Sequence, residues 1–265
     1  MTSAMWSAGA LIAVTILGLI IGSFLNVVIW RVPRGESVVR PSSHCPSCGS
    51  AIRPWDNVPV LSWLLLRRRC RACSAPISGR YPAVELLTAA VFLVLALRIG
   101  LDAALPAFLY LGAAGVALAV IDLDVKRLPD AIVLPSYVVA LVLLGGAAVV
   151  DGEWSNLLRA LFGMAALFLF YFLLVLVYPS GMGLGDVKLA GVLGLFLGYL
   201  GWAEVVTGGF LGFLFGGVVG GALMAMRKAG RKSKIPFGPF MLAGALVAIV
   251  AGGALADLYL DSVLG

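Results

Sequence analysis

The sequence predicts an all-α polytopic membrane protein of about eight transmembrane helices with a small cytoplasmic zinc-binding loop domain. The first observation is composition, because 62% of the 265 residues are hydrophobic and only 12% are charged. Soluble domains carry about 25% charged residues. The second observation is that apolar runs long enough to cross ~30 Å of hydrocarbon recur along the chain. Each run must be helical, since lipid offers no partner for open backbone groups.

The predicted spans share a nearly uninterrupted apolar character, and they lie near residues 6–30, 83–99, 104–121, 131–150, 156–178, 187–203, 206–226 and 237–256. Two of them, 83–99 and 187–203, are short for a span. The first run has no basic residue before it and is too long for a signal-peptide core, so we expect it to remain as an anchor. The predicted domains are residues 1–30 as the first transmembrane helix, 31–82 as a cytoplasmic four-cysteine zinc domain and 83–265 as a seven-helix membrane core.

The distribution of Lys and Arg predicts that both termini lie outside the cytoplasm. In that orientation the segments 31–82, 122–130, 179–186 and 227–236 are cytoplasmic, and the last of them carries Arg227, Lys228, Arg231, Lys232 and Lys234. Only Arg98 and Arg159 fall near the outer face, whose loops carry acids such as Glu204. Topology and contact with anionic lipid therefore explain the net charge of +6, and no nucleic-acid partner is needed.

The 31–82 segment holds all four cysteines, as "CPSC" (Cys45 and Cys48) and "CRAC" (Cys70 and Cys73). Two CxxC pairs separated by 21 residues are typical of a tetrahedral zinc site. Two disulfides are the rival interpretation, but they rarely persist in a reducing cytoplasm; redox chemistry and inert thiols are further alternatives. Four thiolates leave no open coordination position, so the metal is predicted to be structural. His44 is predicted to be a solvated loop residue. Because it is the only histidine in the sequence, a serine–histidine or cysteine–histidine hydrolase is not expected.

Four carboxylates lie where predicted spans meet the cytoplasm. "IDLDVKRLPDAIVLP" contains Asp122, Asp124 and Asp130, and "GMGLGDVKLA" contains Asp186. Asp124 and Asp130 are accounted for as solvated or dipole-complementing residues, with Asp130 able to cap the next helix. Asp122 and Asp186 differ, because each borders a long apolar run, where an isolated charge is costly.

Two such carboxylates brought together do not both ionise readily, which leaves an acid beside a base. This pair is suited to water attack on a peptide bond, so Asp122 and Asp186 are hypothesised to form an aspartic protease site. Gly181, Gly183 and Gly185 would let an extended substrate approach the backbone. The alternative is an ion- or proton-coupled transporter that uses the same carboxylates.

Several segments, taken in order, carry a resemblance to a known family: "GSFLNVVIWRVPRGES", "CPSC", "RPWDNVPVLSWLLLRRRCRAC", "ISGRYPAVELLTA", "IDLDVKRLPDAIVLP", "GMGLGDVKLAG" and "IPFGPFMLAG". They resemble the type IV prepilin leader peptidase family, a group of bifunctional membrane enzymes, and the resemblance extends along almost the whole chain. The resemblance implies that Asp122 and Asp186 are the catalytic aspartates. The segment "IPFGPF" is expected to be an irregular stretch facing the active site or merely a helix start.

The resemblance also implies a bacterial inner-membrane enzyme with a cytoplasmic active site. Such enzymes cleave the basic leader of prepilins and of pilin-like secretion proteins (pseudopilins), then methylate the new N-terminus with S-adenosylmethionine. A peptidase without methylation would require lesions near the cysteine loop, and the sequence has none.

The methyl donor has no glycine-rich βαβ fingerprint in this sequence. A pocket between the zinc loop and the membrane core is expected instead, with Asn26 and Glu85 as tentative cofactor-binding residues at the inner ends of their spans. The alternative for Asn26 is an interhelical hydrogen bond beside Gly22 and Ser23. The alternative for Glu85 is an ion pair with a loop arginine.

Overall fold

The computed structural model describes residues 7–178, 182–227 and 235–264. Gly181 and the predicted inner basic residues Lys228, Arg231, Lys232 and Lys234 lie outside the described residues. The long helices are α1 (Ala8–Arg31), α3 (Arg80–Ile99), α4 (Leu105–Val125), α5 (Asp130–Asp151), α6 (Trp154–Val177), α7 (Leu184–Leu200), α8 (Trp202–Ala225) and α9 (Gly238–Leu264). The loop between α1 and α3 carries the short helices η1 (Val32–Arg34), η2 (Pro54–Asp56) and α2 (Leu61–Leu65).

The predicted all-α polytopic fold is confirmed, since the described ranges contain no strand and each predicted span coincides with one long helix. Seven of these helices are long and apolar enough to cross a membrane. The other, α7, has only 17 residues. One boundary differs from the prediction: the chain turns at Gly201, so Glu204 lies in the first turn of α8 and is 8% exposed, not in an outer loop.

Large apolar side chains on the helix surfaces are exposed, among them Val142, Phe162, Leu173, Val206 and Phe210. Their exposed fractions lie between 58% and 69%. Apolar surface on this scale is not stable in water and marks contact with a partner or with lipid. Together with the helix lengths, it indicates a multi-pass protein whose helices are covered by the bilayer.

The chain forms two compact units, one of Met1–Leu101 with Gly112–Ala117 and one of Asp102–Leu111 with Leu118–Gly265. In the first unit α1 packs against α3 through glycines. A Cβ at Gly18 would lie 2.7 Å from the Cα of Ala89, and one at Gly22 would lie 2.7 Å from the Cα of Glu85. Small residues four apart therefore let the two backbones approach closely, as in many membrane helix pairs.

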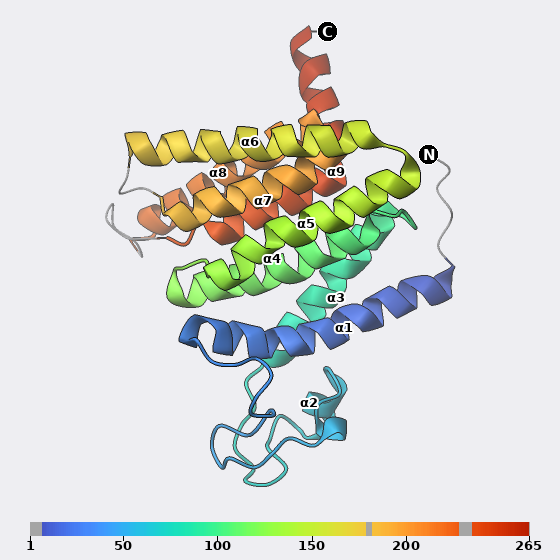
Figure 1. The fold of residues 1–265 in the computed structure, drawn as a ribbon. Helices are drawn as coiled ribbons and strands as arrows, with labels where there is room; N and C mark the ends of the chain where they lie inside the picture. Colours follow the sequence, from blue (N-terminus) through green and yellow to red (C-terminus); the bar gives the residue numbers. More distant parts are fainter. Residues whose placement is uncertain (1–6, 179–181, 228–234, 265) are drawn as a thin grey trace. The chain divides into compact units, whose positions relative to one another are not determined.

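In the second unit α7 packs against α5, α6, α8 and α9, and Figure 1 shows it among them. Its residues from Leu189 to Tyr199 are all buried. Gly194 and Gly198 meet Gly163 of α6 so closely that a Cβ at Gly198 would lie 3.2 Å from the Cα of Gly163. Because protein covers α7, this helix does not need the length of a lipid-exposed span.

The C-terminus of α7 is capped by Arg159 of α6. The Arg159 guanidinium donates to the carbonyl oxygens of Gly198 (2.7 Å), Tyr199 (2.7 Å) and Leu200 (3.0 Å). The last carbonyls of a helix have no partner within the helix, and a cation there also complements the helix dipole. The position of Arg159 on the predicted outer side therefore has a structural explanation.

Replacing Arg159 with alanine leaves these three carbonyls without their guanidinium partner. We expect Arg159→Ala to lower the free energy of unfolding by about 2–4 kcal/mol. Thermal unfolding of the purified protein in detergent measures the change. Arg98→Ala, which removes the other outer arginine from an exposed position, serves as the control and should change stability by less than about 0.5 kcal/mol. Equal effects of the two substitutions would contradict the capping role.

Candidate active site and metal centre

The two aspartates predicted to be catalytic each accept a backbone hydrogen bond where a helix begins. Asp122, near the end of α4, is 4% exposed, and its Oδ2 accepts from the N–H of Gly238 at 3.0 Å. Gly238 is the first residue of α9. Asp186 lies in the first turn of α7, and its Oδ2 accepts from the N–H of Gly183 at 3.1 Å. Amide groups at a helix start favour a bound anion, so both carboxylates have a local stabilising partner.

Leu128, in the connection between α4 and α5, brings the two carboxylate sites together within the second unit. Its side chain lies against Gly185, the residue before Asp186, and against Gly238, the partner of Asp122. A Cβ would lie 3.2 Å from Leu128 at Gly185 and 3.1 Å from it at Gly238. Within "IPFGPF", Gly238 both begins α9 and binds Asp122.

Asp130 takes no part in this arrangement. Both of its carboxylate oxygens accept from Nζ of Lys188 at 2.8 Å, and its side chain is 55% exposed. The N-cap of α5 is Pro129, so Asp130 begins the helix without a side-chain capping bond. An exposed pair of this kind contributes little stability, but it joins the start of α5 to α7 beside Asp186.

The four cysteines converge, as the spacing predicts. Their Sγ atoms all lie within 4.8 Å of one another, and those of Cys45 and Cys73 are 3.8 Å apart. A tetrahedral zinc ion with bonds of ~2.3 Å holds its sulfurs about 3.8 Å apart. The cysteines are not joined by disulfides. The donor set and its spacing therefore fit a four-thiolate metal site.

The two CxxC turns have the same backbone form. Short antiparallel bridges, His44 with Ala51 and Arg69 with Pro76, close them. Four residues after the first cysteine of each, the chain adopts a left-handed conformation, at Gly49 (φ 70°) and at Ser74 (φ 59°). Each turn thereby directs both of its sulfurs to one point.

The polar surroundings of one of the four cysteines, Cys48, suit a thiolate ligand. Hydrogen bonds from Ser50 lower the pKa of Cys48 to about 6, which favours the thiolate, the form that binds metal. His44 does not belong to the cysteine cluster, since its Nδ1 lies 3.1 Å from the carbonyl oxygen of Ser42.

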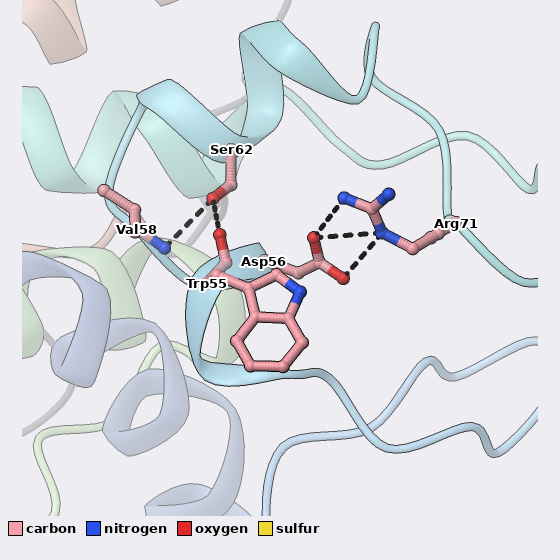
Figure 2. A network of polar contacts seen from close by, with 5 residues as sticks. All are labelled: Trp55, Asp56, Val58, Ser62 and Arg71. Atoms are coloured by element: carbon pink, nitrogen blue, oxygen red, sulfur yellow. Dashed lines mark hydrogen bonds and ion pairs between the residues drawn. The ribbon is translucent and has the colours of Figure 1, made fainter.

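A polar network joins the second CxxC turn to η2, and Figure 2 shows it. Arg71, between Cys70 and Cys73, donates from Nε (2.9 Å) and Nη2 (2.6 Å) to the two carboxylate oxygens of Asp56. This guanidinium lowers the pKa of Asp56. Ser62 of α2 donates to the carbonyl oxygen of Trp55 and accepts from the N–H of Val58. The network fixes the 54–59 segment against the cysteine site.

The two tentative cofactor residues both form hydrogen bonds with protein groups. Asn26 donates from Nδ2 to the carbonyl oxygens of Gly22 (3.3 Å) and Tyr81 (3.2 Å), which joins α1 to α3. Glu85, 7% exposed, accepts from the N–H of Val60 at 2.8 Å and from the Ser23 hydroxyl. The bond from Asn26 to Tyr81 is of the interhelical kind that was the alternative for Asn26.

The sequence reasoning gave no role to Gly238 or Leu128, and it did not single out Arg31. Arg31 ends α1, is 8% exposed, and borders a cavity of about 570 Å³ in the first unit. The sequence did contain a signal for Arg31, because this arginine directly follows the first apolar run at its predicted inner end.

Comparison with known proteins places the chain in a family. Residues 16–99 match the bacterial peptidase A24 N-terminal domain, and residues 107–225 match the type IV leader peptidase family. Proteins named prepilin leader peptidase/N-methyltransferase are 35% identical in Stutzerimonas stutzeri and 34% identical in Pseudomonas aeruginosa PAO1, each over 93% of this chain and 92% of the relative. A protein of the same name in Myxococcus xanthus is 43% identical over 69% of this chain and 54% of the relative.

No solved structure matches the chain. The chain belongs to the type IV leader peptidase family, and the resemblance stated from the sequence is confirmed.

A side chain at position 238 would collide with the bound carboxylate, since its Cβ would lie 2.8 Å from Oδ2 of Asp122. We expect Gly238→Ala to lower the free energy of unfolding by about 1–3 kcal/mol, because the start of α9 must move. Gly146→Ala, at an exposed glycine with no atom within 4 Å of the added Cβ, is the control and should be neutral or slightly stabilising. Thermal unfolding of the two purified variants in detergent measures both changes. A Gly238→Ala variant as stable as the wild type would contradict the close contact between Gly238 and Asp122.

Proposed function

We propose that Asp122 and Asp186 are the catalytic pair of a peptidase that removes the leader of type IV prepilins and pseudopilins. Membership of the family and relatives at 34–43% identity support prepilin cleavage followed by N-methylation, and do not favour a transporter. The observation that supports the assignment of the pair is the packing of both Gly185, the neighbour of Asp186, and Gly238, the partner of Asp122, on Leu128.

The chemistry requires one protonated and one ionised carboxyl group. The ionised group takes a proton from water as the water oxygen bonds to the scissile carbonyl carbon, and the protonated group supports the carbonyl oxygen. When the carbon–nitrogen bond breaks, the nitrogen takes a proton and leaves as the new N-terminal amine. The leader departs as a carboxylate. The backbone N–H groups of Gly183 and Gly238 orient the two side chains throughout.

Membrane-length helices and family membership support a multi-pass inner-membrane protein. We propose further that both termini lie outside and that the aspartates face the cytoplasm, because basic residues such as Lys126 and Arg127 adjoin them. A substrate whose apolar helix is in the bilayer would then present its cleavage site at the inner interface. The basic leader would be held at this interface by anionic lipid.

The four-cysteine site is proposed to hold a structural zinc ion. The sulfur spacing supports this assignment, and four thiolates would leave no position for a substrate. The ion would fix the loop between α1 and α3, including the 54–59 segment, which the Arg71–Asp56 pair joins to the second CxxC turn.

The methyltransferase names of the relatives imply S-adenosylmethionine as a second cofactor. When bound, it supplies an electrophilic methyl group to the new α-amine, which forms the nitrogen–carbon bond as the carbon–sulfur bond breaks and then releases a proton. Direct binding by Asn26 and Glu85 stays a prediction. Their hydrogen bonds support a positioning role: Asn26 joins α1 to α3, and Glu85 holds the backbone at Val60.

Asp122→Asn and Asp186→Asn each remove a group that must exchange protons, and we expect at least a hundredfold loss of leader cleavage. Purified variants in detergent are incubated with a prepilin, and the shortened product is quantified. Asp130→Asn is the matched control, because this residue pairs with Lys188, and it should retain cleavage within about fivefold. Normal cleavage by either of the first two variants would refute the assignment of that residue.

Cys45→Ser and Cys70→Ser each remove one of four thiolates, so we expect bound zinc to fall to less than half of the wild-type content. Elemental analysis of the purified protein measures it. His44→Ala should keep the full metal content, since His44 lies outside the cluster. Undiminished zinc in both cysteine variants would overturn the site.

A further inference from the structure

We propose that the cavity of the first unit binds S-adenosylmethionine, with the Arg31 guanidinium binding its carboxylate. This inference rests on the proposed N-methylation. The cavity has a volume of about 570 Å³, within the ~300–1,000 Å³ typical of small-molecule sites. It lies on the face of α1 that carries Ile20, Phe24, Val27 and Arg31, and the 38–43 and 54–59 segments close it.

This face of α1 differs from the one that packs on α3. Gly18 and Gly22 contact α3, and Leu25 and Ile29, which follow at helical spacing, are also buried. The cavity residues are offset from these by two positions, about 200° around a helix with 3.6 residues per turn. One face of α1 therefore builds the helix pair, and the opposite face is left for a ligand.

Arg31 supplies the charge that an amino acid carboxylate needs. Arg31 is 8% exposed. Its guanidinium donates one hydrogen bond from Nη1 to the Ser37 carbonyl oxygen, at 2.9 Å. A guanidinium has five N–H donors, so several remain for a ligand. Paired N–H groups of this kind match a carboxylate in two parallel bonds.

The other lining residues suit the rest of the ligand. The ring of Phe24 can contact an adenine face or a sulfonium cation. The Asn57 amide and the Ser42 hydroxyl offer donors and acceptors for ribose and adenine, and the Ser23 oxygen, whose hydroxyl donates to Glu85, offers an acceptor. An apolar cavity with a few polar groups and one cation is typical of a small, orienting site.

The wall made by Val58 and Pro59 ends in a strained turn. Val60 has φ 60° and ψ −48°, a conformation that a β-branched residue rarely adopts. The N–H of Leu61 bonds the carbonyl oxygen of Pro59, which closes a γ-turn of the strained type. The buried Glu85 holds this turn through the Val60 N–H, and strain of this kind is concentrated at ligand sites. Glu85 is therefore a positioning residue for the cavity.

The same wall is tied to the metal centre. Asp56 binds Arg71 between two of the cysteines (Figure 2), and Ser42 and Ser43 of the opposite wall directly precede His44 and Cys45. Loss of the metal would release both walls of the cavity. This arrangement explains why a structural ion would matter to a methyl-transfer site that it does not touch.

The experiment measures binding of two ligands to the purified full chain in detergent by calorimetry. S-adenosylhomocysteine carries the carboxylate, whereas 5′-methylthioadenosine lacks it. We expect Arg31→Gln to raise the Kd of the first ligand at least tenfold and that of the second less than twofold. Arg34→Gln removes an exposed arginine that stacks on Trp30 outside the cavity, and it should leave both constants within twofold. Val27→Trp, which fills the cavity, should weaken both ligands at least tenfold.

Zinc content and prepilin cleavage are measured on the same preparations, so that a misfolded variant is recognised. The proposal is overturned if Arg31→Gln and Val27→Trp bind S-adenosylhomocysteine as the wild type does. It is also overturned if phosphatidylglycerol displaces the ligand, because the cavity is then a lipid site. A wild-type protein that binds S-adenosylhomocysteine but does not cleave prepilin would refute the peptidase assignment alone.

Discussion

The exclusion of unpaired polar groups from hydrocarbon governs this structure. A chain that is 62% hydrophobic must still hold two carboxylates close to its membrane helices, and it does so where helices begin. There the backbone has N–H groups without helical partners, and these groups bind the carboxylates of Asp122 and Asp186. The same rule explains Arg159, which satisfies the carbonyl end of α7. Helix ends thus serve as the polar positions of an otherwise apolar unit.

The sequence predicted the parts of the fold that depend on neighbouring residues. Hydropathy located every long helix, and the CxxC spacing identified the four sulfurs that converge. The two aspartates could be singled out because each borders an apolar run. The bond from Gly238 to Asp122 joins residues 116 positions apart, so no local pattern could predict it. Glu204 was misplaced because Gly201 moves the helix boundary by several residues.

Glycine pairs were a signal that the sequence did contain. Gly18 and Gly22 on α1, and Gly194 and Gly198 on α7, are each four residues apart and lie at close helix contacts. This spacing is typical of membrane helix pairs, although it does not name the partner helix. The cavity of the first unit could not be predicted, because its walls come from three separate segments that only the folded loop brings together.

The capping of α7 at both ends has a consequence for how this enzyme could evolve. Asp186 sits at one end and the Arg159 contact at the other, so the helix acts as a spacer of 17 residues, about 25 Å long. One inserted residue would shift the carboxylate by ~1.5 Å and rotate it by about 100°, away from Leu128 and Asp122. The length of α7 is therefore fixed by the two ends that it joins, while the close contacts of Gly194 and Gly198 constrain its middle.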